Sequence, residues 1–501
     1  MLQNSTYKKL NTLKSMCELT GKKFLPVFLL STVILIGCLS DTSVERPNIV
    51  WIIAEDLSQD LGAYGNDVVN TPNIDQLAQK GVRFANVFTT SPVCSPSRTA
   101  LATGMYQTSI GAYHMRYPDS LKQDLPDTIQ TIHQIFRKNG YLTASIEDEP
   151  ATGKTDWMFK ADRDKNFDVY HWEELTGQNK PFFAQVSVSN THRPFPEVEE
   201  KEELVQQVEL PPYYPDNIVV RKDWAGYYKS AAELDNKVGQ ILSTLEERQL
   251  EENTIVIFFS DHGRPMTRGK YWNYDSGMRV PMVIHIPENL NALSEYEPGI
   301  IEDDLISHID ITATTLSFAG IEKPEYMQGR IFWGPEKDPK REYVFSASDR
   351  IGELHFRSRA VRSLEYKYIR NYHNNFSIND ASTAYRKANH PIYHVLNILH
   401  EKGSLDDVQQ TLVESMPEEE LYNLKKDPYE LNNLANDPET SDRLISLRKE
   451  LDNWMQSIRD QGMNEDSEEI IKAFDQYGKQ SIERYENQIK ELHVLVRNQL
   501  E

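Results

Sequence analysis

The sequence predicts an α/β fold in which a mostly parallel central sheet is flanked by helices. Two observations support this prediction. Continuous apolar runs of strand length recur along the chain, as is typical of strands buried on both faces. Segments with helical periodicity lie between them, and strands that alternate with helices indicate a parallel sheet. The apolar runs cover residues 48–54, 141–146, 182–189, 254–260 and 281–286.

The longest helical pattern covers residues 228–247, where apolar side chains recur at intervals of three and four. The pattern changes after about residue 345. A strand pair is predicted at 359–370, a turn-centred hairpin or connector at 420–434, and acidic helices from 439 to the end. We therefore predict a large domain at 47–345 and a smaller C-terminal α/β subdomain with acidic helices at 346–501.

Length and charge restrict the class of protein. A chain of 501 residues can bury a large core and hold more than one domain or subdomain. The net charge of −22 argues against nucleic-acid binding, which needs a basic surface. Any anion must therefore bind in a locally basic pocket. Only three cysteines occur, Cys17, Cys38 and Cys94, which argues against a disulfide framework.

The N-terminus carries a targeting pattern. Lys22 and Lys23 precede an apolar run at 24–36, which is shorter than the roughly 20 residues of a membrane-spanning helix. The sequence Leu-Ile-Gly-Cys that ends at Cys38 resembles a bacterial lipobox. It predicts a signal peptide at 1–37, lipidation of Cys38 and a linker at 38–46. The alternative is an ordinary secretory signal or membrane anchor with a chance cysteine.

This pattern also predicts a location. A lipid on Cys38 would anchor the protein to a membrane of the bacterial envelope, in the periplasm or at the outer membrane or cell surface.

The most informative local sequence is Cys-Ser-Pro-Ser-Arg at 94–98. A thiol is followed by a proline two residues later and an arginine four residues later, at the start of a helix predicted over 99–103. Pro96 suits the first turn of this helix, and Ser95 is predicted near its N-cap. The N-terminus of the helix would then direct free N–H groups at an anion. Taken alone, an unpaired cysteine such as Cys94 is more often a small buried apolar residue.

Two pairs of polar residues, each with at least one carboxylate, follow predicted strands. Glu55 and Asp56 end the run at 48–54, and Asp261 and His262 follow the run at 254–260. Open α/β sheets build their sites beyond the carboxyl ends of the strands, so these pairs are expected to meet. Carboxylate oxygens suit Ca²⁺ or Mg²⁺. The alternative for each pair is an ordinary acidic loop.

The sequence at 94–98 resembles the maturation signature of type I sulfatases, members of the alkaline phosphatase superfamily. The resemblance covers the chain from about residue 46 to about 434, and the most similar subgroup is the bacterial heparan N-sulfatase-like one. It implies an alkaline phosphatase-like fold. It also implies that a formylglycine-generating maturation enzyme oxidises Cys94 to Cα-formylglycine (3-oxoalanine), the nucleophile, with Arg98 as a second catalytic residue.

The resemblance implies further roles. Lys154 and Lys270 match the sulfate-binding lysines, and His192 matches the histidine that contacts sulfate or protonates the leaving oxygen. His114, shortly after the predicted helix, is a candidate for the sugar pocket, with a structural role as the alternative. The implied metal is Ca²⁺, ahead of Mg²⁺, and its implied ligands are Glu55, Asp56, Cys94, Asp261 and His262.

The sequence departs from the family pattern at two positions. Glu55 stands where an aspartate is usual, which lengthens one ligand. Asp156 stands where a histidine is usual, so the role of that histidine is not carried over.

The expected function is removal of sulfate from a sulfated polysaccharide or oligosaccharide, either an algal polymer such as ulvan or a glycosaminoglycan. Two alternatives stay open. One is a phosphate or phosphonate ester hydrolase of the same superfamily. The other is a non-catalytic lipoprotein that binds sulfated glycans with Cys94 unconverted.

Overall fold

The computed structural model describes residues 46–501 except residues 179 and 335. The predicted signal peptide, nearly all of the linker and Cys38 lie outside the described residues. Residues 46–501 form one compact unit, so the domain boundary at 345 stays a prediction. No helix in the part of the chain that the structure describes is both long and apolar enough to cross a bilayer.

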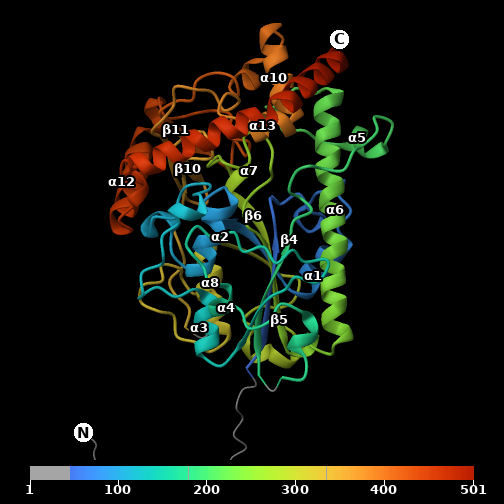
Figure 1. The fold of residues 1–501 in the computed structure, drawn as a ribbon, viewed down its shortest axis with the longest axis vertical. Helices are drawn as coiled ribbons and strands as arrows, with labels where there is room; N and C mark the ends of the chain where they lie inside the picture. The colour runs from blue at the N-terminus through green and yellow to red at the C-terminus, as the bar shows by residue number, and fades with distance from the viewer. Residues whose placement is uncertain (1–45, 179, 335) are drawn as a thin grey trace, which may run out of the picture. The chain divides into compact units, whose positions relative to one another are not determined.

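Two sheets contain the strands (Figure 1). The central sheet is made of β1 (Asn48–Ala54), β2 (Val82–Phe88), β3 (Leu142–Ser145), β4 (Phe182–Val188), β5 (Thr254–Ser260), β6 (Arg279–His285) and β7 (Ile301–Ser307). The second sheet is made of β8 (Val344–Ser348), β9 (Ser358–Arg362), β10 (Tyr366–Asn371) and β11 (Glu419–Asn423).

The α-helices are distributed along the whole described chain. They are α1 (Pro72–Lys80), α2 (Cys94–Thr103), α3 (Ile132–Lys138), α4 (Arg163–Asn166), α5 (Glu203–Gln207), α6 (Ile218–Glu247), α7 (Asp275–Met278), α8 (His308–Phe318), α9 (Ala384–Asn389), α10 (Pro391–Glu401), α11 (Asp407–Gln410), α12 (Ser441–Ser457) and α13 (Glu468–Leu500).

The central sheet has the strand order β3-β4-β1-β5-β6-β2-β7. All neighbours are parallel except β6, which is antiparallel to both β5 and β2. The predicted mostly parallel sheet is therefore confirmed, as are the five strands predicted from apolar runs. Strands β2 and β7 were not predicted, because polar residues interrupt their apolar pattern.

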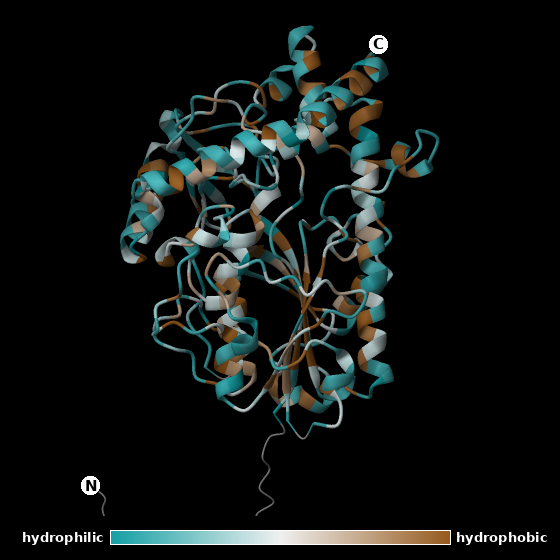
Figure 2. Ribbon diagram, in the orientation of Figure 1, coloured by the Kyte–Doolittle hydropathy of each residue, from teal (hydrophilic) through white to brown (hydrophobic). Residues whose placement is uncertain are grey.

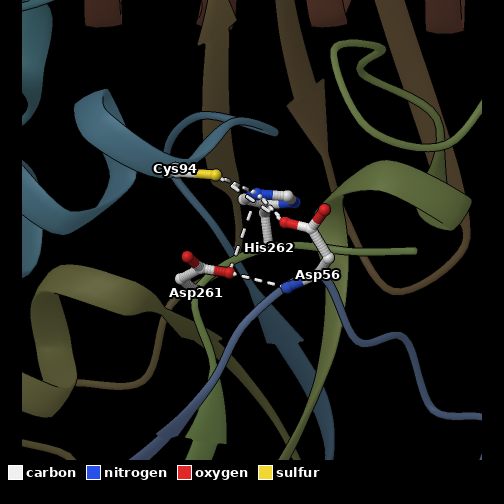
Figure 3. A group of neighbouring side chains, drawn as sticks. All are labelled: Asp56, Cys94, Asp261 and His262. Carbon is white, nitrogen blue, oxygen red and sulfur yellow. Dashed lines mark hydrogen bonds and ion pairs between the residues drawn. The ribbon is translucent and has the colours of Figure 1, made fainter. Parts of the chain in front are cut away.

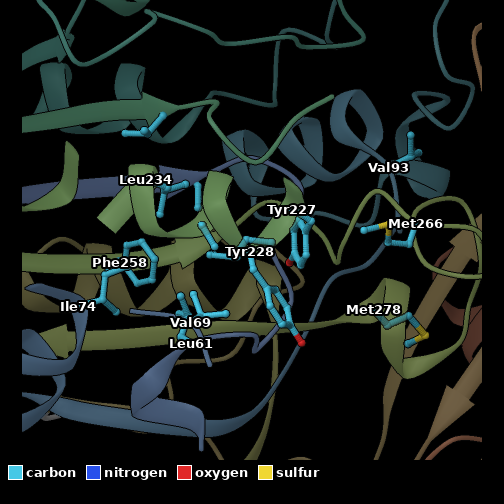
Figure 4. Close-up of a cluster of buried hydrophobic side chains, with 14 of the residues drawn as sticks. Leu61, Val69, Ile74, Val93, Tyr227, Tyr228, Leu234, Phe258, Met266 and Met278 are labelled. Carbon is cyan, nitrogen blue, oxygen red and sulfur yellow. The ribbon is translucent and has the colours of Figure 1, made fainter. Parts of the chain in front are cut away.

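Strand β1 lies at the centre of the core. Every residue of β1 is buried, and successive side chains face opposite sides of the sheet. Val50 and Ile52 belong to a core that includes residues of α1 and α6 (Figure 4). Trp51 and Ile53 belong to a second core that includes residues of α3 and α8. Helices thus cover both faces, which explains why the strand sequence is continuously apolar.

Helix α6 extends ten residues further toward the N-terminus than the pattern at 228–247 predicts. It begins after Asn217, whose side chain accepts hydrogen bonds from the N–H groups of Val219 and Val220. Figure 2 shows apolar residues concentrated on the strands, with polar residues on the outer surfaces of the helices.

The second sheet is antiparallel and has the order β11-β10-β9-β8. It confirms the strand pair predicted at 359–370. Helix α12 packs on this sheet, since Leu447, Leu451 and Trp454 share a core with Val361 and Tyr368. The predicted acidic helices are α12 and α13, and α13 runs past α9 and α10 (Figure 1).

Candidate active site

The carboxyl ends of β1 and β5 form the floor of the site. These strands are neighbours, so the two acidic pairs meet at one edge of the sheet. The N–H of Asp56 donates to Oδ1 of Asp261 at 3.0 Å, and the N–H of Asp261 donates to the carbonyl of Ala54 at 3.0 Å. These bonds fix the two carboxylates relative to each other.

Helix α2 begins at Cys94 itself. Its N-cap is Val93, which has no capping side chain, and Ser95, which was predicted near the N-cap, lies inside the first turn. The prediction for Ser95 was therefore wrong by two positions, whereas Pro96 occupies the first turn as predicted. The N-terminal N–H groups of a helix favour negative charge. Residue 94 therefore stands where an anion is stabilised.

The sulfur of Cys94 is surrounded by charged groups (Figure 3). It lies 3.2 Å from Nε2 of His262 and 3.2 Å from Nζ of Lys270. Carboxylate oxygens of Glu55 and Asp56 each lie 3.7 Å from it. Cys94 is 1% exposed, so this thiol is not an ordinary surface cysteine.

Four of the five predicted metal ligands form one group, called the metal-type group below. One donor atom from each of Asp56, Cys94, Asp261 and His262 lies within 4.8 Å of the others, and all four residues are buried. Glu55, the fifth predicted ligand, is not part of this group, and its carboxylate pairs with Lys154. Two carboxylates suit a hard divalent cation, and an imidazole is also an acceptable donor. The residues present therefore fit a metal ion.

Opposite charges stabilise each other in this buried site. Burial would raise the pKa of Asp56, but the charges of Lys270 and His262 hold this pKa well below its usual value. Burial has the same effect on Asp261, and there His262 and Arg98 lower the pKa to about 2. Both carboxylates are therefore ionised at neutral pH. The two carboxylates in turn outweigh burial and raise the pKa of His262 well above its usual value.

Arg98 and Lys270 bring positive charge to the site. Nε of Arg98 donates to Oδ2 of Asp261 at 2.8 Å, and Nη1 donates to the hydroxyl of Ser187 at 3.0 Å. Nζ of Lys270 lies 2.9 and 2.8 Å from the two oxygens of Asp56. Each cation is thus held by a carboxylate of the metal-type group.

A cavity of about 310 Å³ opens beside these groups. Lys270 and His192 line it. Nδ1 of His192 donates to the carbonyl of Arg193 at 2.7 Å, and Nε2 lies 3.9 Å from Glu55. The Nε2 edge of the ring is the one available for proton exchange with a ligand.

His114 does not line this cavity. It is 1% exposed and its Nε2 lies 2.7 Å from Oδ1 of Asp466, so a carboxylate from the C-terminal part of the chain holds it in place. Its neighbours Met115 and Arg116 line the cavity instead. Nη2 of Arg116 donates to Oδ2 of Asp156 at 2.7 Å.

The C-terminal helices complete the cavity wall, which the sequence did not predict. The contributing residues come from α9, from the residue that follows it and from α13, and no local motif marks them. They are Tyr385, Arg386, His390, Tyr477 and Ser481.

The site combines a buried potential nucleophile at a helix N-terminus with two lysines, an arginine and the metal-type group. These features together define a hydrolase of anionic esters. The comparison with protein families is consistent with this class. Residues 47–175 and 163–321 match the Sulfatase family, and residues 267–418 match the C-terminal region of N-sulphoglucosamine sulphohydrolase. The chain belongs to the sulfatase family and is a sulfuric ester hydrolase.

Individual relatives agree with the family. An ulvan-active sulfatase of Formosa agariphila is 34% identical over 479 residues, which cover 86% of this chain and 78% of the relative. Human N-sulphoglucosamine sulphohydrolase is 25% identical over 467 residues, which cover 83% and 91%. A phosphonate monoester hydrolase from Silicibacter pomeroyi has the same fold, with a TM-score of 0.55 and 16% identity over 84% of this chain and 97% of that one.

Proposed function

We propose that this sulfatase removes sulfate from a sulfated polysaccharide or oligosaccharide, with a formylglycine at position 94 and a divalent metal. The observation that carries the proposal is the position of Cys94. It lies at the N-terminus of α2, 3.2 Å from Lys270 and within the metal-type group. The relatives named as ulvan-active and N-sulphoglucosamine sulfatases support an algal polymer or a glycosaminoglycan as the substrate class.

The proposed metal is Ca²⁺, ahead of Mg²⁺. Asp56 and Asp261 supply hard oxygen donors, which both cations prefer. A cysteine thiol is a poor ligand for either cation, and conversion of Cys94 to formylglycine would replace its sulfur by oxygen. The metal would supply positive charge against the sulfate oxygens.

The hydrated aldehyde of formylglycine would supply an oxygen nucleophile for the sulfur atom of the ester. Lys270 and Lys154 bind and orient the sulfate oxygens by charge. Nη2 of Arg98 is buried without a hydrogen-bond partner among the described residues and so remains available as a donor. His192, at the cavity wall, delivers a proton from Nε2 to the departing sugar oxygen.

Two further proposals concern maturation and location. Because Cys94 is buried in the fold, we expect a formylglycine-generating enzyme to oxidise it before the chain folds. We also propose that a lipid on Cys38 anchors the protein in the bacterial envelope, in the periplasm or at the cell surface. The lipobox-like sequence supports this.

Sulfate release tests the proposal. The protein is co-expressed with a formylglycine-generating enzyme, and the aldehyde at position 94 is confirmed by mass. Ulvan, fucoidan, carrageenan, chondroitin and heparan oligosaccharides are then assayed, with Cys94→Ala as the control. Sulfate release that is absent in the control is expected. Hydrolysis of phosphate or phosphonate esters, without sulfate release, would contradict the proposal.

A further inference from the structure

Arg386 is a buried cation that pairs with no carboxylate in the described part of the chain. It is 3% exposed on α9 and lines the cavity beside Lys270. Nη2 donates to the carbonyl of Met266 at 2.8 Å, and the guanidinium lies 4.7 Å from the centre of the Tyr271 ring. Nη1 has no hydrogen-bond partner, and no carboxylate among the described residues forms an ion pair with Arg386.

A second arginine on the same cavity wall, Arg193, does have a carboxylate partner, unlike Arg386. Arg193 is also buried, and its Nη1 and Nη2 donate to the two oxygens of Asp223 at 2.7 and 2.6 Å. Burial lowers the pKa of Arg386, and the nearby charge of Arg193 lowers it further. Burying a charge without a counter-charge is costly. A ligand with its own negative charge would offset that cost.

The position of Arg386 relates it to the sulfate site. Tyr271, over which the guanidinium lies, directly follows Lys270, whose Nζ is 3.2 Å from the sulfur of Cys94. Arg386 also lines the same cavity as Lys270 and Asp56, both of which contact residue 94. A group bound by Arg386 would belong to the same sugar as the scissile sulfate, or to its neighbour.

Two other cavity residues suit the remainder of a sugar. His390 lies one helical turn after Arg386, and its Nδ1 has no hydrogen-bond partner within residues 46–501, residues 179 and 335 apart. Burial and the charge of Arg193 lower the pKa of His390 well below its usual value, so the ring is neutral. Glu353 accepts a hydrogen bond from the N–H of Ala384, and none of the residues that the structure describes donates to its second oxygen. Both groups are suited to sugar hydroxyls.

We infer that Arg386 recognises a second anionic group of the substrate, a carboxylate or a further sulfate, beside the sulfate that is cleaved. This inference rests on the proposed function. A guanidinium matches the oxygens of both groups better than an ammonium does. The substrate class is then a sulfated sugar that carries a uronic acid or a second sulfate.

The test compares three matched sugars: a neutral hexose monosulfate, the corresponding uronic acid monosulfate and the corresponding hexose disulfate. The wild type should have the highest kcat/KM for a sugar with a second anionic group. Which of the two such sugars it prefers identifies that group as a carboxylate or a sulfate. Arg386→Gln should reduce this preference about 10- to 100-fold, the range of a lost charged hydrogen bond. Lys387→Gln removes the neighbouring charge, which does not line the cavity, and should keep the preference.

Equal loss of kcat/KM on all three sugars in Arg386→Gln would overturn the inference, because Arg386 would then only support the loop through Met266. If that variant does not fold, inhibition of the wild type by free hexuronate and by neutral hexose replaces it, and equal inhibition overturns the inference. Sulfate release from the oligosaccharide panel described above separates the two proposals. Its absence from every oligosaccharide contradicts the proposed function, and calorimetry with hexuronate and hexose still tests Arg386.

Discussion

His133 is an uncharged histidine held inside an aromatic cage. It lies on α3 with no exposed surface, and neither ring nitrogen has a hydrogen-bond partner among the residues described by the structure. The rings of Trp157, Phe167 and Phe183 surround it with centroids 5.6, 4.7 and 5.0 Å away. Burial lowers the pKa of His133 from 6.5 to about 3. We predict that this residue makes the fold sensitive to mild acid.

The sign and size of this pH effect on stability follow from the linkage between proton binding and folding. Below pH 6.5 the unfolded chain binds a proton at His133 that the native protein does not bind until about pH 3. The free energy of unfolding is therefore unaffected by His133 above its pKa in the unfolded chain. It decreases as the pH falls from that pKa toward the pKa of His133 in the folded protein. The slope is about 1.4 kcal/mol per pH unit, so this residue lowers the free energy of unfolding by about 2 kcal/mol between pH 7 and pH 5.

Urea unfolding of the wild type and His133→Leu at pH 7 and pH 5, at one calcium concentration, measures this effect. The packing change in the variant is the same at both pH values, and other titrating groups are common to both proteins. The variant should therefore gain about 2 kcal/mol relative to the wild type on going from pH 7 to pH 5. An unchanged difference between the two proteins would refute the assignment of a buried neutral histidine.

Three further predictions concern charges. Lys270→Met should lower kcat about 10²- to 10³-fold. In urea unfolding it should also lose more stability than Lys154→Met, because the ammonium of Lys154 is more exposed than that of Lys270. Removal of metal by a chelator should abolish sulfate release and lower Tm in a thermal scan, with recovery on adding Ca²⁺; a Tm that does not change would contradict the metal site. Asp310→Ala should cost about 3–5 kcal/mol in urea unfolding because Arg341 loses its partner, with kcat/KM of the folded enzyme preserved. A loss of kcat/KM would place Asp310 in the chemistry.

The fold could be predicted where burial on both faces determines the sequence. Strands β1, β4 and β5 are fully buried, so their apolar runs are continuous and easily recognised. Strand β7 lies at the edge of the sheet and begins with an exposed Ile301, followed by acidic residues. An edge strand needs no continuous apolar sequence, so periodicity alone does not reveal it.

The candidate site could be predicted where its residues follow strands or stand in a short motif. Asp56, Asp261 and Cys94 belong to this set, and the structure brings them together. The outer cavity wall could not be predicted, because it depends on how distant helices pack. Tyr477 and Arg386 reach the cavity from α13 and α9, and Asp466 holds His114 away from it. Such contacts leave no local signal in the sequence.

The two departures from the family pattern act on one lysine. Glu55, which is one methylene longer than the usual aspartate, pairs with Nζ of Lys154 and lies 3.9 Å from Nε2 of His192. Asp156, in place of the usual histidine, lies 3.7 Å from the same Nζ and also accepts from Arg116. Both carboxylates therefore neutralise and orient Lys154, which leaves Asp56 and Asp261 as the oxygen donors of the metal-type group. Restoring the aspartate at position 55 alone would shorten one partner of Lys154 and leave Asp156 to hold it, so the two positions are best understood and varied as a pair.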